Sequence, residues 1–288
     1  MTQFRRSASL TIGKPNALTA ISIKDLRITF EISKVESKDP NTAKIEVFNL
    51  SEDTRKKIET EQLGDNIILY AGYLDGEGEQ LLFSGDVVSV THKIIRPNVV
   101  TTIMANDGAN SLGSSKISIS KNKGVSARSI LQTILSTFPL PNNLKTIFLP
   151  VEKIYSNGFA FTGMSKVALT KVTEYLDLEW TIQNNEIRLT PFDGNDSTTA
   201  VLLNTKSGLL NSPSRILDDT KKAKGTSVKN KPGWKVQSLL SPKINPKGQL
   251  GISSREIPDN TIFNVHSVIH RGDTHGPEWI STIEVHDQ

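Results

Sequence analysis

Four histidines near the C-terminus are the strongest candidates for metal chemistry in the sequence: His266, His270, His275 and His286, with Asp273 among them. Neutral imidazoles and a carboxylate can bind a divalent cation. In a strand, however, His266 and His270 would share a face but lie about 13 Å apart, too far for one ion unless the strand bulges. The helical spacing of a His-Glu-x-x-His site is also absent. The pattern therefore favours histidines at a surface or an interface over a metal site.

The glycine-rich and serine-rich segments lack the spacing of known catalytic or nucleotide-binding loops. The stretch 76–78 has no Lys-Ser/Thr pair and opens no helix, so we interpret it as the turn of a hairpin and not as a phosphate-binding loop. No Gly-x-Ser-x-Gly segment is present to hold a nucleophilic serine. Arg271-Gly272-Asp273 is an integrin-type tripeptide, but no secretion signal accompanies it. We interpret it as a turn in which glycine supplies the permissive backbone.

Paired carboxylates would be needed for a lysozyme-like hydrolase, and the sequence leaves such a pair open. Glu179 and His270 are the residues whose mutation should abolish activity if the protein cleaves peptidoglycan. Acidic residues mostly fall in predicted turns or on wet strand faces, where solvated carboxylates are ordinary. The sequence therefore predicts no catalytic, cofactor-binding or metal-binding residue, and no cofactor. The acidic residues in predicted turns are Asp75, Asp107, Asp193 and Asp259.

The densest run of positive charge lies in the segment 221–231, which is rich in Gly, Ser and Asn. Such a run can form a loop that touches phosphate or an acidic protein surface. It lacks the interleaved aromatic residues that a single-strand stacking site uses, which favours a solvated lysine loop. The lysines of the run are Lys221, Lys222, Lys224, Lys229 and Lys231.

Composition places the chain among globular proteins. It has 288 residues, 36% hydrophobic and 22% charged, and no cysteine, so disulfides, thiolate nucleophiles and thiolate metal sites are excluded. Its 34 basic and 30 acidic residues give a net charge of +4, too modest for a dedicated duplex-DNA binder. The longest apolar runs fall far short of the roughly 20 residues of a membrane helix. The arginines at 5–6 are followed by polar residues, so we expect no signal peptide.

The elements that must position any site begin with strands. Alternation of apolar and polar residues predicts strands over 19–34, with a break near residues 24–25, and over 42–50. Ser51 is the expected N-cap of a short helix, because acidic residues follow it in the first turn. Further strands are expected over 66–73, 81–90 and 97–105. Residues 1–110 therefore hold five or six strands and one helix, and a small barrel or sandwich is their natural closure.

The middle of the chain, residues 111–195, has a mixed α+β pattern. Helical spacing of apolar residues predicts one helix from Ser126 to about Pro139 and a second over 165–176. Alternation around Asn184-Asn185 predicts a tight hairpin, since Asn tolerates the positive φ of such a turn. In residues 196–288 short strands return, punctuated by Gly and Pro, and indicate a second barrel. They are expected over 200–203, 215–217, 225–228, 234–240, 249–253, 261–270 and 279–285.

The predicted fold is therefore mainly β with an α+β insert: two small tube-like β-barrel domains, 1–110 and 196–288, flank a mixed domain at 111–195. The segments 43–51, 53–55, 71–73 and 83–87 resemble the first domain of bacteriophage tail (baseplate) hub proteins of the late-control-protein-D-like type.

The C-terminal part carries the same resemblance, in the order that the hub family has. The segments 207–213, 238–246 and 265–279 resemble the second barrel of these hubs. The resemblance implies a homotrimer in which two barrels per subunit form a pseudo-sixfold ring, which joins the sixfold tail tube to the threefold spike.

On this resemblance the protein is a structural component of the virion tail, assembled in the host cytoplasm, and not an enzyme. Its implied partners are the tail-tube, spike, tape-measure and neighbouring baseplate proteins. DNA would pass through the lumen without sequence-specific binding, and no membrane span is expected. A tail-associated peptidoglycan hydrolase and a tail-tube protein are the alternatives: the first needs an acid/base pair or a metal, and the second would polymerise into long tubes.

Overall fold

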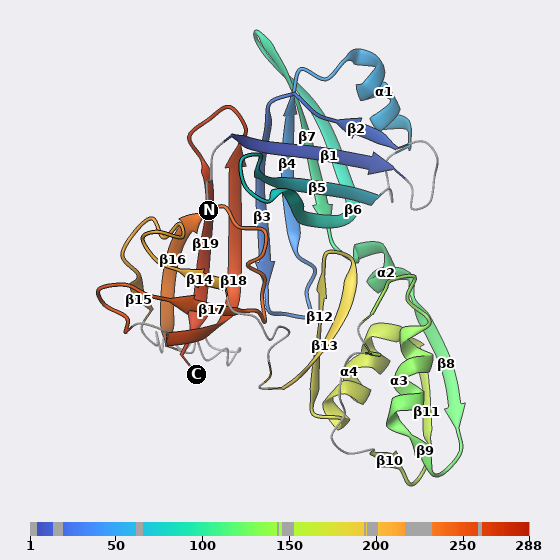
Figure 1. Ribbon diagram of the computed structural model, residues 1–288. Helices are drawn as coiled ribbons and strands as arrows, with labels where there is room; N and C mark the ends of the chain where they lie inside the picture. The colour runs from blue at the N-terminus through green and yellow to red at the C-terminus, as the bar shows by residue number, and fades with distance from the viewer. Residues whose placement is uncertain are drawn as a thin grey trace, which may run out of the picture.

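A large antiparallel sheet dominates the computed structural model, which is mainly β (Figure 1). Its thirteen strands, counted over the part of the chain that the structure describes, run from the C-terminal third into the N-terminal third. The predicted strand over 225–228 and the lysine run 221–231 lie outside the described residues, as do Asp193 and Asp259. The described residues are 5–13, 20–61, 66–142, 144–145, 153–192, 194, 201–216, 232–258 and 261–287.

The N-terminal half of the sheet curls around a core of inward-facing aliphatic residues, in the strand order β3-β4-β7-β6-β5-β1-β2. The break near residues 24–25 and the helix after Ser51 are confirmed, and Ser51 Oγ accepts a hydrogen bond from Thr54 N at 3.1 Å. We did not predict β1, although its Leu10 and Ile12 point into the core. The elements are β1 (Arg6–Gly13), β2 (Ile21–Ile23), β3 (Ile28–Val35), β4 (Thr42–Phe48), α1 (Glu52–Glu61), β5 (Asn66–Tyr73), β6 (Gly78–Ile95) and β7 (Asn98–Asn106).

The middle segment forms an α+β unit with its own core, in which α3 and α4 bury their apolar faces. The helix predicted to open at Ser126 is confirmed, and Ser126 caps it: its Oγ accepts a hydrogen bond from Ser129 N at 3.2 Å. The hairpin turn is confirmed too, with φ of 55° at Asn184 and 61° at Asn185. The elements are α2 (Ala109–Ser114), β8 (Lys116–Lys121), β9 (Val125–Ser126), α3 (Ala127–Leu135), β10 (Ile154–Tyr155), β11 (Phe159–Met164), α4 (Ser165–Tyr175), β12 (Leu178–Gln183) and β13 (Glu186–Pro191).

The C-terminal third forms the other barrel-like half of the sheet, around a third core. Its longest strand, β18, pairs with β17 and β19, and its second part, residues 267–273, also pairs with β3. Through this β18–β3 pairing, one continuous sheet serves both halves. The elements are β14 (Val201–Leu203), β15 (Ser214–Ile216), β16 (Gly233–Leu239), β17 (Gln249–Ile252), β18 (Thr261–Asp273) and β19 (Trp279–His286).

The three hydrophobic cores lie within the three predicted segments, with two exceptions. Leu240 and Trp279 come from the C-terminal third but are buried in the N-terminal core. Trp279 makes edge-to-face contacts with Phe30 and Tyr73, with ring centroids 5.5 and 6.5 Å away. Such aromatic pairs add about 0.5–1.5 kcal/mol beyond their burial. The C-terminal half is therefore anchored inside the N-terminal half by side chains as well as by strand pairing.

Candidate functional site

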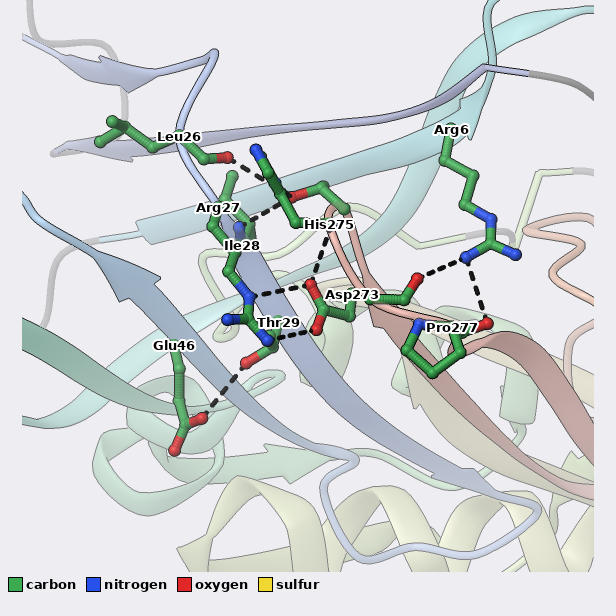
Figure 2. Close-up of polar contacts among 11 residues, drawn as sticks. Arg6, Leu26, Arg27, Ile28, Thr29, Glu46, Asp273, His275 and Pro277 are labelled. Atoms are coloured by element: carbon green, nitrogen blue, oxygen red, sulfur yellow. Dashed lines mark hydrogen bonds and ion pairs between the residues drawn. The ribbon is translucent and has the colours of Figure 1, made fainter. Parts of the chain in front are cut away.

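The two halves of the sheet meet at a set of contacts that we call the clamp: residues 273–277, which start at the last residue of β18, against Arg6, Arg27 and Ile28 (Figure 2). The guanidinium of Arg27 binds the Asp273 carboxylate through two hydrogen bonds, Nε to Oδ1 at 3.1 Å and Nη2 to Oδ2 at 2.7 Å. This two-point geometry fixes orientation as well as distance. The clamp therefore opposes rotation of one half against the other.

Backbone groups complete the clamp. Thr274 Oγ1 accepts a hydrogen bond from Ile28 N at 3.0 Å, and Thr274 N donates to the Ile28 carbonyl at 3.1 Å. Arg6, at the start of β1, donates from Nη1 to the carbonyls of Gly276 (2.7 Å) and Pro277 (3.1 Å). Figure 2 shows Arg6 and Arg27 reaching the same loop from opposite sides. Two separate segments of the N-terminal half, at Arg6 and at residues 27–28, thus hold one loop of the C-terminal half.

The electrostatics of the clamp favour its charged form. Partial burial acts to raise the pKa of Asp273, but hydrogen bonds from Arg27 and from the His275 and Gly276 backbone outweigh it and lower that pKa. The Arg27 guanidinium also lies over the Phe48 ring, 4.6 Å from its centroid, a favourable cation–π position. The carboxylate therefore stays ionised and paired at neutral pH.

The interpretation of Arg271-Gly272-Asp273 as a turn is wrong. All three residues lie in β18 and pair with Glu31, Phe30 and Thr29 of β3. A Cβ at Gly272 would lie 2.2 Å from the Phe30 ring, so glycine is required by the close approach of that ring and not by an unusual φ. The tripeptide is therefore part of the joint between the halves.

Next to the clamp, an open groove of about 550 Å³ runs along β3, β4 and β18. Four of its charged side chains form two ion pairs, Arg271 with Glu31 and Lys44 with Glu46, each at 2.8 Å. A general acid or nucleophile needs a reactive group aimed at a substrate, and these groups are held by one another. The groove lining is Thr29, Phe30, Glu31, Lys44, Glu46, Arg271, Gly272, Asp273, Pro277 and Glu278.

A second joint, which we call the polar junction, ties the middle segment to both halves. It consists of Lys34, Asn41, Asp107, Asn184 and Asn245. Lys34 lies on the inward face of β3, is fully buried, and donates from Nζ to Asn184 Oδ1 at 3.1 Å and to Asn245 Oδ1 at 2.8 Å. One amine thus contacts the middle segment and the C-terminal half from its place in the N-terminal half.

The acidic member of the polar junction is Asp107, in the turn after β7. It accepts hydrogen bonds from Asn41 N and Nδ2, both at 2.7 Å, and from Asn184 N at 3.1 Å. We expected solvated carboxylates in turns; Asp107 is in a turn but is fully buried. Burial raises its pKa to about 7, against the opposing effect of the Asn41 hydrogen bonds and of the Lys34 charge.

Glu179, the carboxylate that the hydrolase alternative singled out, belongs to the same boundary. Its Oε2 lies 2.6 Å from Nζ of Lys247, which also contacts Glu36 Oε1 at 2.5 Å. His270 lies elsewhere, in β18, where its Nδ1 is 2.8 Å from Ser281 Oγ. The structure does not bring Glu179 and His270 into one polar contact among the residues it describes, and it gives Glu179 a structural partner.

The histidines do not gather as the metal alternative requires. A bulge between Val265 and Ser267 turns His266 outward, where it stacks on His286 with ring centroids 4.2 Å apart. His270 points inward and is fully buried, so the expectations that it shares a face with His266 and lies at a surface are wrong. His275 is exposed beside Thr274. Over the described ranges, no three His, Asp or Glu side chains are placed to bind one metal ion.

Burial decides the charge of His270. It lowers the pKa of the imidazole to about 3, with a further lowering from the charge of Lys34. His270 is therefore neutral at physiological pH.

Within the described residues, no helix has the length and apolar character needed to cross a membrane.

Comparison with known proteins identifies the fold. No protein-family profile matches the sequence, and no curated protein matches it. Solved structures do. A tail protein from Neisseria meningitidis matches with a TM-score of 0.66 at 8% identity, over 98% of this chain and 97% of that one. The 43 kDa tail protein of prophage MuSo2 from Shewanella oneidensis matches with a TM-score of 0.65 at 8% identity, over 97% and 98%.

A third similar structure comes from a secretion system. It is an E. coli protein described as a component of the type VI secretion system with structural similarity to T4 bacteriophage tail proteins. Its TM-score is 0.60 at 11% identity, over 97% of this chain and 76% of that one. Because the matches span almost the whole chain, they cover both halves of the sheet and the middle segment. The chain has the fold of bacteriophage tail proteins and of this related secretion-system component.

Proposed function

We propose that the protein is a structural hub of a bacteriophage tail baseplate, forming a trimeric ring that joins the tail tube to the central spike. The observation that carries the proposal is the joint between the halves: one sheet continues through β3 and β18, and the clamp holds it. A chain built in this way presents two β units at a fixed angle. Three such chains offer six units to a sixfold tube and keep threefold symmetry towards a spike.

The proposed domains are residues 1–110, 111–195 and 196–288. The first and third supply the ring units, and the middle one decorates the ring and contacts neighbouring baseplate proteins. The proposed partners are two further copies of the chain, the tail-tube protein, the spike and the tape-measure protein, with DNA passing through the lumen. The protein then resides in the virion tail after assembly in the host cytoplasm.

The role proposed here is mechanical, without bond chemistry on a substrate. Two observations support it against the hydrolase alternative: four charged side chains of the groove form ion pairs with one another, and Glu179 binds Lys247. A tail-tube protein would use one β unit per chain and polymerise without limit, whereas two unequal units in one chain favour a closed ring.

The mass of the purified protein in solution tests the proposal. We expect light scattering across a range of concentrations to give three times the chain mass, and negative-stain images of the same fractions to show rings with a central hole. Open polymers would contradict the hub and support a tube protein. Release of peptidoglycan fragments that is lost in Glu179→Gln would contradict the mechanical role.

A further inference from the structure

The polar junction places an amine, a side-chain amide and a carboxyl together inside the protein. Lys34 Nζ lies 3.1 Å from Asn184 Oδ1, so the amide carbon bonded to that oxygen is close to the nitrogen. Asp107 Oδ2 accepts from Asn184 N at 3.1 Å, which puts the carboxyl beside the same asparagine. Lys34 and Asp107 are both fully buried. An amine is a nucleophile when it is neutral, and an amide carbon is an electrophile when its oxygen is protonated or polarised.

We propose that Lys34 and Asn184 join in an intramolecular isopeptide bond, with Asp107 carrying the proton. The reaction is an exchange of one amide for another. Lys34 Nζ bonds to Cγ of Asn184, the bond from Cγ to Nδ2 breaks, and Nδ2 leaves as ammonia. Asp107 first shares its proton with the amide oxygen, and one proton of the attacking amine then moves through Asp107 to the leaving nitrogen. Asp107 recovers its own proton when the carbonyl of the new amide forms. Nothing is oxidised or reduced, and no water or cofactor is consumed.

The surroundings favour the reactive protonation states. Burial lowers the pKa of Lys34 to about 7, partly opposed by Asp107 and assisted by Arg188. Burial raises the pKa of Asp107 to about 7. Because both pKa values lie near 7, the neutral amine and the protonated carboxyl are accessible near neutral pH, whereas in water both groups are charged. The floor of the site is apolar, because Lys34 continues the inward row of Ile28, Phe30 and Ile32 on β3.

Lys34 also touches a second amide, that of Asn245, and the structure favours Asn184 over it. The Nδ2 group of Asn245, which would have to leave, donates to the Pro242 carbonyl at 3.2 Å. Asp107, which must supply the proton, is hydrogen-bonded to the backbone N–H of Asn184. Asn245 thus orients the amine, while Asn184 contacts the amine through its side chain and the carboxyl through its backbone N–H.

The bond would tie β3 of the N-terminal half to the tip of the β12–β13 hairpin, which reaches up from the middle segment in Figure 1. It spans 150 residues of chain. A covalent tie at this position would hold the middle segment to the sheet under load, in addition to hydrogen bonds such as that from Gly108 N to Asn185 Oδ1. It would also restrict the unfolded chain, as any long-range cross-link does.

The intact mass of the purified full-length protein tests the bond directly, under conditions that unfold the chain. We expect a mass lower than the sequence mass by one ammonia, and fragment spectra of a tryptic digest that show a branched peptide joining Lys34 to Asn184. A mass equal to that of the sequence, after prolonged incubation of the folded protein at neutral pH, would overturn the proposal. A branched peptide joining Lys34 to Asn245 would overturn the assignment to Asn184.

Three variants assign the roles. Asn184→Ser removes the amide carbon and should keep the full mass, as should Asp107→Asn, which removes the proton carrier. Asn245→Ser is the matched control: it removes the other amide that Lys34 contacts and should still lose ammonia. Circular dichroism identifies any variant that does not fold. The mass of the protein without substitutions decides the proposal even if a variant fails to fold. Loss of ammonia in Asn184→Ser but not in Asn245→Ser would overturn it.

Discussion

At the scale of single residues, the joint between the halves depends on side chains that local sequence pattern describes poorly. Gly272 is an example: its missing side chain leaves room for the Phe30 ring, which in turn contacts Trp279. Packing at this point joins the N-terminal core to the C-terminal half. A methyl group placed there has to displace an aromatic ring that belongs to both.

We predict that Gly272→Ala destabilises the protein by about 1–3 kcal/mol, the usual cost of overpacking a core. The matched control is Gly113→Ala, because a Cβ at Gly113 meets nothing within 4 Å. Chemical denaturation of both variants measures the difference. An equal effect of the two substitutions would contradict the packing role of Gly272.

A second prediction at this scale concerns His270, whose low pKa sets the sign of a pH effect on the free energy of unfolding. The folded imidazole, with a pKa of about 3, stays neutral between pH 6 and pH 4, whereas the unfolded one takes up a proton. The stability that depends on this residue is therefore fully present above the unfolded pKa. It is lost as the pH falls below that value, by up to about 1.4 kcal/mol per pH unit. His270→Gln should lack this slope. Parallel pH profiles of the free energy of unfolding for the two proteins would contradict it.

The sequence could have indicated the buried position of Lys34, but not the burial of Asp107 or the faces of His266 and His270. Lys34 continues the inward alternation of Ile28, Phe30 and Ile32, so a lysine at a core position was visible in the pattern. The burial of Asp107 was not, because a turn shows no periodicity. The faces of His266 and His270 were predicted wrongly, because the β18 bulge shifts the alternation by one residue and leaves no local sign.

At the scale of elements, capping and turn chemistry were predictable and strand partners were not. Ser51 and the Asn184-Asn185 turn act as predicted, and a helix begins after Ser126 as predicted, because caps and tight turns depend on local interactions of the backbone. The pairing of β3 with β18 joins residues about as far apart as the chain allows. Alternation shows that both are strands but not that they are neighbours.

The prediction at this scale concerns the contact between Arg27 and Asp273 in the clamp. Arg27→Met keeps most of the side-chain volume but removes both hydrogen bonds to Asp273. Because Arg27 is 43% exposed, we expect a loss of about 1 kcal/mol in the free energy of unfolding, at the low end for a charged pair. Lys44→Met, which breaks the Lys44–Glu46 pair in the same groove, is the control, and an exposed pair of this kind contributes about 0.5 kcal/mol or less.

The comparison of Arg27→Met with Lys44→Met tests the role of the clamp. If the clamp couples the halves, amide hydrogen exchange in β3 and in the second part of β18 should rise together in Arg27→Met and stay unchanged in Lys44→Met. Faster exchange confined to the loop 273–277 would show that strand pairing alone holds the halves, and would contradict the role given to the clamp.

At the scale of the whole molecule, we propose that the chain is a two-unit building block held together by the sheet, the clamp and the polar junction. The mainly β class with an α+β insert was predictable from alternation and from the two amphipathic helices. The continuity of the sheet was not, since it depends on long-range pairing. The similarity to phage tail proteins spans nearly the whole chain and therefore concerns this complete arrangement.

The most direct measurement of the central claim is a single-particle reconstruction of the assembled protein. We expect a closed ring of three chains in which six β units, two from each chain, surround an open channel, with the β3–β18 joint intact inside every chain. A helical tube built from one unit per chain, or a particle that stays monomeric at every concentration and with tail-tube and spike proteins added, would contradict it.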